Sequence, residues 1–302
     1  MSLSSDINVG RLGGPRFPYV EFSENNKVET QLAKLWKFYL PNDTRPHGCL
    51  LDSVVKKMPW TNDFRLDHEP ASNLALDEQL DLARSKNVFL KLGAKRDEEF
   101  PIIRANFELH IERSAGSLFG VICGGVRMTV YSRGPRGIRF WIAQRNLDED
   151  ACPGKLDNAV AGGIAVGEEP LDCLIKEAGQ EAGFDEDSVL RDAEAAGTIT
   201  WFYVAGELCL VNSGITYVYD MEVLNVLMLE PVDGDIKGIF STDVDDILFF
   251  MKKGYFKPSS ANAMMDFLMR HKYITAENEK DYAEILQRLH RTLPFPTSPS
   301  AA

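Results

Sequence analysis

The sequence has few of the residues that build disulfide frameworks, structural zinc sites or membrane spans. Its 302 residues include five cysteines without a C-x-x-C pair and five histidines without a zinc-ligand spacing. Apolar stretches such as residues 223–229 and 247–251 are bounded by charges and fall far short of the ~20 residues of a membrane helix. The first 20 residues contain no apolar run of a secretory signal. We therefore expect a cytoplasmic protein with reduced thiols and no membrane partner.

Positive charge is also in short supply. Lys and Arg total 33 against 45 Asp and Glu, which gives a formal charge of −12 and opposes nucleic-acid binding. The hydrophobic fraction of 44% and the charged fraction of 26% are those of a globular protein, and the length fits about two domains. A phosphate-bearing ligand would need a local basic patch or a metal ion.

The N-terminal part reads as a small α+β module. Residues 28–40 have the apolar spacing of an amphipathic helix. A second helix is expected from Ser72, its N-cap, with Leu76, Leu80 and Ala83 on one side. Nothing in this part has a spacing that demands chemistry.

The rest of the chain predicts a mixed α/β unit followed by helices. Alternating residues from 126 to 142, interrupted by a Gly/Pro turn, predict a β-hairpin, and residues 198–204 and 215–223 read as strands. Helices are expected at 169–182 and 243–253 and again after Gly254. The predicted division is residues 1–112 for the module, 113–253 for the α/β domain, 254–293 for a C-terminal helical extension and 294–302 for a flexible tail.

The helix at 169–182 carries a pattern with a chemical demand. Pro170 suits its first turn and Gly183 its left-handed C-terminal position. Its predicted core-facing stripe is Leu171, Leu174, Ile175, Ala178 and Ala182, with Glu177, Gln180 and Glu181 on the opposite side. Glutamates at i and i+4 repel unless a cation lies between them, and these oxygen ligands suit Mg²⁺ or Mn²⁺. The alternative is a solvated acidic face.

The loop before this helix extends the pattern. Gly162, Glu168, Glu177, Glu181 and Gly183 fit the spacing Gly-x5-Glu-x7-Arg-Glu-U-x-Glu-Glu-x-Gly-U, where U is a bulky apolar residue. This stretch resembles the signature of the Nudix hydrolases of the MutT type. The departures are Lys176 in place of Arg, Gln180 in place of the first paired Glu, and Ala178 and Phe184 at the apolar positions.

The resemblance implies a Nudix α/β/α sandwich with a mixed sheet and a hydrolase acting on phosphoric anhydride bonds. It makes Glu177 and Glu181 metal ligands, adds Gln180 and the carbonyl of Gly162 to the set, and pairs Glu168 with Lys176 as a structural ion pair. The implied cofactor is Mg²⁺, with Mn²⁺ as an alternative. Because Gln180 brings no charge, we expect activity with a higher metal requirement.

Further stretches resemble one Nudix subgroup, which is related to thiamine pyrophosphokinase. They are residues 45–48 with 60–66, 153–163, 217–222, and 256–258 with 266–271, within a likeness that covers about residues 30–293. The implied substrate is thiamine diphosphate, or its oxidised analogues, cleaved to the monophosphate. The alternatives are a nucleoside-diphosphate-X hydrolase and a non-catalytic Nudix-like ligand-binding module. The N-terminal module is a candidate for part of the pocket or for the interface of a homodimer.

Two further residues are candidates for the site. Glu222, at the end of a predicted strand, is a candidate general base or additional metal ligand, and its alternative is a strand-edge carboxylate. Arg145 is a candidate contact to the substrate phosphate, and its alternative is a solvated surface arginine. Cys173 is interpreted as a small buried residue, and Trp201 and Tyr203 as core aromatics.

Overall fold

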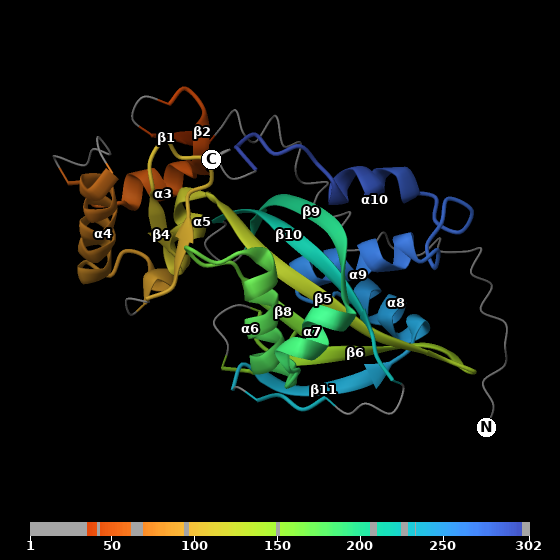
Figure 1. Ribbon diagram of the computed structural model, residues 1–302. Helices are drawn as coiled ribbons and strands as arrows, with labels where there is room; N and C mark the ends of the chain where they lie inside the picture. The colour runs from red at the N-terminus through yellow and green to blue at the C-terminus, as the bar shows by residue number, and fades with distance from the viewer. Residues whose placement is uncertain are drawn as a thin grey trace.

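The computed structural model describes residues 35–40, 43–61, 69–93, 97–148, 152–205, 210–224, 229–232 and 234–297. Figure 1 shows the N-terminal elements grouped at one end of a large twisted sheet, with helices on both faces of that sheet. Within the described part of the chain, no helix is both long and apolar enough to cross a bilayer.

The described N-terminal elements form two small antiparallel ribbons, three α-helices and two short 3₁₀ helices (η) around their own core. They are β1 (Trp36–Tyr39), β2 (Pro46–Leu50), α3 (Asp52–Lys57), α4 (Glu69–Ser85), η1 (Leu90–Leu92), β3 (Glu99–Pro101), β4 (His110–Glu112), η2 (Arg113–Ala115) and α5 (Gly116–Phe119). β1 pairs with β2, and β3 with β4. Leu76, Leu80 and Ala83 of α4 are buried in this core, as predicted.

Two expectations for this region are wrong. Residues 36–39, predicted as the end of a helix, form strand β1, because their aromatic side chains favour the extended state and β2 supplies backbone partners. The preceding residues, 28–34, lie outside the described residues. Helix α4 begins at Glu69, N-terminal to Ser72, so Ser72 is not its N-cap.

The large sheet is mixed. Its strands are β5 (Ile122–Gly134), β6 (Gly137–Arg145), β7 (Leu156–Asn158), β8 (Val160–Gly163), β9 (Ala193–Ala205), β10 (Leu210–Glu222) and β11 (Ile236–Thr242). They run in the order β11-β6-β5-β10-β9, with β7 beside β6 and β8 beside β5. β5 and β10 are parallel, whereas the other pairs are antiparallel. The predicted hairpin is β5 with β6.

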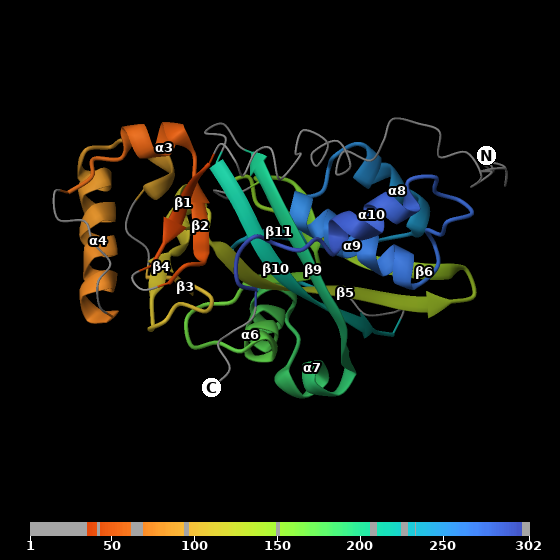
Figure 2. The same cartoon turned by 90° about the horizontal axis from the view of Figure 1, so that it is seen from above.

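Helices cover the two faces of this sheet, as Figure 2 shows. One face carries α6 (Pro170–Ala182) and α7 (Glu186–Asp192), and the other carries α8 (Val244–Lys252), α9 (Pro258–Arg270) and α10 (Tyr282–Leu289). A separate apolar cluster lies under each set, one around Leu174 and Ala178 and one around Phe267 and Phe140. The mixed α/β sandwich with flanking elements is confirmed.

The end of the described chain differs from the predicted flexible tail. Phe295 is buried and packs on Phe202 of β9, with the ring centroids 6.2 Å apart. Residues 298–302 of that tail lie outside the described residues. The predicted domain boundaries stay predictions, although α9 shares its apolar cluster with β5 and β6.

Candidate active site

Strand β8 and helix α6 bring the signature residues together. Pro170 occupies the first turn of α6, and Gly183 ends the helix with φ 70°, as predicted. Leu174, Ala178 and Ala182 are buried, but Leu171 is 40% exposed. The buried arc of the helix is rotated toward Cys173 and Glu181, which turns Leu171 to the rim.

Glu181 is a buried carboxylate held against the backbone of β8. It is only 5% exposed, and its Oε2 accepts a hydrogen bond of 2.6 Å from the Ala161 N–H. Burial raises the pKa of Glu181 well above the usual range, and the negative charge of Asp157 raises it further. The ionised form of Glu181 therefore calls for a nearby cation.

Glu177 lies directly over Gly162. A Cβ atom at Gly162 would lie 2.2 Å from Cγ and 2.5 Å from Oε1 of Glu177, so the carboxylate occupies space that only glycine leaves open. The side chain of Glu177 is 18% exposed, and its Oε1 lies 3.6 Å from Lys176 Nζ. Burial raises the pKa of Glu177, while Lys176 and Arg113 pull it down.

Glu168 and Lys176 form the predicted ion pair. Lys176 Nζ donates to Glu168 Oε1 at 2.5 Å, and Glu168 Oε2 accepts from the Ala165 N–H at 3.0 Å. Burial works against the charged form of Glu168, but these two donors still bring its pKa below the usual value. The pair ties the loop before α6 to the helix.

The other two predicted metal ligands, Gln180 and the carbonyl of Gly162, stay predictions. Gln180 is exposed. The carbonyl oxygen of Gly162 lies close to β5: a Cβ atom built on Gly125 would be 2.9 Å from this oxygen. Among the residues that the structure describes, no group of three or more His, Cys, Asp or Glu is arranged to hold a metal ion. The donor set that the fold assembles is the pair Glu177 and Glu181.

This donor set fits a divalent cation. Two carboxylates whose charged forms are penalised by burial gain most from a positive charge between them, and oxygen ligands suit Mg²⁺ or Mn²⁺. Waters and substrate oxygens commonly complete the shell of such ions. Cys173 is no competing ligand, because it is buried, its Sγ donates to the Gly163 carbonyl, and burial raises the pKa of its thiol to about 12.

Glu222 is not brought to this site. It ends β10, is ion-paired with Arg133, and has a side chain that is 45% exposed. In the sheet register Gly162 lies opposite Val126, whereas Glu222 lies opposite Tyr131. At the rise of a strand, that separation along β5 is roughly 16 Å. The strand-edge alternative therefore describes Glu222 better than the role of a base.

Arg145 is buried rather than solvated. It is 7% exposed, and its Nη1 lies 3.5 Å from Asp157 Oδ2. Arg127 and Lys257 approach the same carboxylate, and sequence reasoning assigned neither of them to the site. The sequence contained one indication for Arg127, namely that it is a charged residue within the alternating pattern of the predicted hairpin.

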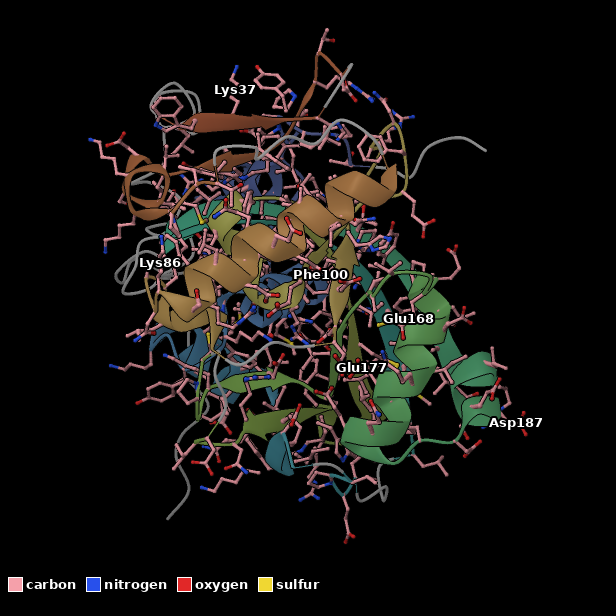
Figure 3. All side chains as sticks on the ribbon, turned by 90° about the vertical axis from the view of Figure 1, so that its left-hand side faces the viewer. Lys37, Lys86, Phe100, Glu168, Glu177 and Asp187 are labelled. Atoms are coloured by element: carbon pink, nitrogen blue, oxygen red, sulfur yellow. The ribbon has the colours of Figure 1, made fainter. Side chains whose placement is uncertain are left out.

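The N-terminal elements also reach the site, which no sequence spacing indicated. Val166, in the loop before α6, donates its N–H to the Glu99 carbonyl at 3.0 Å. A Cβ at Gly163 would lie 3.0 Å from the Phe100 ring. Arg113 Nη1 donates to both oxygens of Glu98, at 2.9 and 2.7 Å. Figure 3 looks onto this region, where the labelled Phe100, Glu168 and Glu177 lie near one another.

Comparison with known proteins gives sequence relatives. No protein-family model matches the chain. It is 30% identical over 198 residues to an uncharacterized protein of Saccharomyces cerevisiae, which covers 62% of this chain and 58% of that protein. It is 29% identical over 236 residues to the chloroplastic Nudix hydrolase 20 of Arabidopsis thaliana, covering 74% of this chain and 62% of the relative. The chain thus spans about three fifths of the length of these relatives.

Solved structures give weaker likenesses. A MutT protein from Methanosarcina mazei is 15% identical with a TM-score of 0.39, over 50% of this chain and 96% of that chain. A Deinococcus radiodurans protein is 18% identical with a TM-score of 0.38, over 64% of this chain and 99% of that chain. Scores this low do not by themselves establish a common fold.

The signature residues on β8 and α6 and the similarity to a plant Nudix hydrolase point to the same class of protein. The chain is therefore similar to members of the Nudix hydrolase family. A second plant relative, the chloroplastic Nudix hydrolase 24 of Arabidopsis thaliana, is 28% identical over 228 residues, or 72% of this chain and 61% of that protein. The cytoplasmic location of this chain stays a prediction.

Proposed function

We propose that the protein is a metal-dependent diphosphatase that hydrolyses a phosphoric anhydride bond in a small metabolite. The observation that carries this proposal is the pair of desolvated carboxylates, Glu177 and Glu181, held on one side of α6 against β8. Both have a raised pKa because of burial, so their charged forms are suited to a bound cation.

In this mechanism the protein supplies position and charge. A bound Mg²⁺ or Mn²⁺, held by Glu177 and Glu181, would neutralise phosphate oxygens and lower the pKa of a water. The Ala161 N–H fixes Glu181, and Gly162 leaves the space in which Glu177 lies. The Glu168–Lys176 pair fixes the loop that joins them.

The reaction is a hydrolysis. Water oxygen forms a bond to one phosphorus, the bridging P–O bond breaks, and the leaving phosphate takes up the displaced charge. We assign the acceptance of the water proton to one of the two carboxylates, Glu177 or Glu181. Glu222 has no part in this step, because in the sheet register it lies opposite Tyr131, several residues along β5 from Val126, which pairs with Gly162.

For the substrate we propose thiamine diphosphate or its oxidised analogues, on the strength of the subgroup-like stretches. Those stretches meet in the structure: Arg270 donates to both oxygens of Asp220, at 2.6 and 2.9 Å, and Lys257 Nζ lies 3.3 Å from Asp157. These contacts bring the subgroup-like stretches together in the fold.

The test is a panel of diphosphates assayed with Mg²⁺. Thiamine diphosphate, its oxo and oxy forms, and nucleoside diphosphate conjugates are compared for product release, with Glu181→Gln as the inactive control. Hydrolysis of thiamine compounds above the others supports the substrate, and preference for nucleoside conjugates supports the alternative. If no compound yields a product, the proposed enzymatic activity is refuted.

A ligand-binding module is the second candidate. It is favoured by the exposed Gln180, which removes a charge from the signature, and by the two-carboxylate donor set. Thermal stabilisation by a diphosphate with no product over long incubation would support this function instead.

A further inference from the structure

A cluster of buried charges lies beside the candidate active site and has no role in the mechanism above. It consists of Arg127 on β5, Arg145 at the end of β6, Asp157 on β7 and Lys257, the residue before α9. We call these four residues the Asp157 cluster. Their side chains are 8%, 9%, 1% and 19% exposed, in that order.

Asp157 is the only acid in this cluster, and three donors bond its carboxylate. Oδ1 accepts from the Asn158 N–H at 2.9 Å and from the Ser260 hydroxyl, and Oδ2 faces Lys257 Nζ at 3.3 Å. Burial opposes its charge, but Lys257 and Arg127 outweigh that effect and hold the pKa of Asp157 at about 2. Asp157 is therefore a permanent anion that must serve several cations.

The cations are incompletely matched. Within the cluster, Arg127 and Lys257 bring two positive charges to the single charge of Asp157, and the neighbouring carboxylate, Glu181, is assigned to the proposed metal. Arg127 donates to the Val126 carbonyl at 2.9 Å and the Ser259 hydroxyl at 2.8 Å, which are both neutral acceptors. Its Nε has no hydrogen-bond partner among the described residues and lies 4.0 Å from Asp157 Oδ1.

Buried positive charge without a matching anion is costly. This cost is visible at Lys257. Burial lowers the pKa of Lys257, Asp157 raises it, and the positive charges of Arg127 and Arg145 lower it further, so that the net shift is downward. The N-terminus of the 13-residue helix α9 begins at the next residue, Pro258, and adds its own partial positive charge. The cluster therefore has the properties of an anion-binding site: positive charge, several hydrogen-bond donors, and the Arg127 Nε–H without a partner among the described residues.

The Asp157 cluster adjoins the carboxylates of α6. In the β5–β8 register the backbone of Arg127 lies opposite Ala161, the residue whose N–H holds Glu181, while the Arg127 side chain reaches Ser259 of α9 on the other face of the sheet. Asp157 and Lys257 both act on the charge of Glu181, one raising and one lowering its pKa. An anion bound at the cluster would thus lie next to the proposed metal ligands.

We propose that Arg127 and Lys257 bind a phosphate group of the diphosphate substrate, with Arg145 beside them. This inference rests on the proposed function for its substrate class. The inference also predicts the substrate specificity: the enzyme should prefer a diphosphate with a free terminal phosphate over a diphosphate that is esterified at both ends.

The first test measures anion binding without turnover. Inorganic pyrophosphate is added to the protein in EDTA, and its apparent Kd is taken from the shift in thermal unfolding. Because a charge-assisted hydrogen bond is lost, we expect Kd to rise about tenfold or more in Lys257→Met and in Arg127→Lys. Lys237→Met, which removes an exposed lysine of β11, is the matched control and should bind as the wild type does. Lys257→Arg should restore binding.

Equal pyrophosphate shifts in wild type and in both variants would overturn the inference, and so would the absence of any shift in wild type. The cluster would then be a clamp that joins α9 to the sheet. Circular dichroism establishes that each variant is folded. If Lys257→Met is not folded, the test uses Arg127→Lys with inorganic phosphate as a product inhibitor. A Ki higher than that of wild type would support the site, and an unchanged Ki would overturn it.

Kinetics separates this inference from the proposed function. With both correct, KM for the diphosphate rises about tenfold in the variants while kcat changes little. Wild-type hydrolysis with unchanged KM in the variants would refute the site and leave the function standing. Pyrophosphate binding that depends on Lys257, without hydrolysis of any diphosphate, would leave the site standing and refute the function.

Discussion

The closest packing in the candidate site, between Gly162 and Glu177, allows a quantitative prediction for Gly162→Ala. Gly162 has no left-handed φ, so alanine fits the backbone, but its Cβ would lie 2.2, 2.4 and 2.5 Å from Cγ, Cδ and Oε1 of Glu177. The carboxylate must move by about the overlap with normal contact distance, roughly 1 Å. We expect kcat/KM to fall about 100-fold, or ~2.7 kcal/mol, because a ligand displaced by that much no longer serves the transition state.

The stability cost should be smaller than the loss of activity. The clash is with a flexible side chain, so we expect about 1–2 kcal/mol in the free energy of unfolding. A double-mutant cycle with Glu177→Ala isolates the contact, since Gly162→Ala should then add little further loss. Gly179→Ala, on α6 with Glu177, is the control: its Cβ would meet Phe184 O at an ordinary 3.6 Å, and the change should stabilise the protein by about 0.5–1 kcal/mol. Wild-type kcat/KM in Gly162→Ala would refute the proposed position of Glu177.

Three further predictions concern Glu181, Gln180 and Glu222. In metal-free protein the raised pKa of Glu181 means that the folded state holds a proton more tightly than the unfolded chain, so stability should fall as pH rises from the usual carboxyl pKa toward the raised value. Glu181→Gln should abolish that part of the pH dependence in thermal melts, together with hydrolysis, and a melt profile parallel to wild type would contradict the burial argument. Gln180→Glu should lower the Mg²⁺ concentration needed for half-maximal activity, as read from a titration, and an unchanged requirement would show that residue 180 is not near the metal. Glu222→Gln should keep kcat within about twofold, since its carboxylate is ion-paired far from α6; a loss of 100-fold would return it to the mechanism.

The sequence predicted the parts of the fold whose signals are local. The ends of α6 follow from Pro170 and Gly183, and the β5–β6 hairpin follows from strict alternation around a Gly/Pro turn. The ion pair between Glu168 and Lys176 lies within one loop and one helix. Each of these needs only the residues close to it in the chain.

What the sequence could not show depends on distant partners. The segment at 36–39 becomes a strand because β2 offers its backbone, and apolar spacing alone does not reveal that partner. Lys257 reaches Asp157 only after α9 folds onto the sheet, and Arg127 reaches it only after β5 and β7 come together in the sheet. Glu222 was predicted as a site residue because the sequence does not reveal the register between the parallel strands β10 and β5. That register decides which residues lie beside Glu222.

The contact between β3 and the loop before α6 has a practical consequence. Glu99 and Phe100 support that loop from outside the predicted Nudix domain, through the Val166 N–H and the face of Gly163. A minimal core that starts at residue 113 would lack this support, and its loop would be free to move. Such a fragment is the wrong object for ligand screening, since an inactive fragment would say nothing about the full chain.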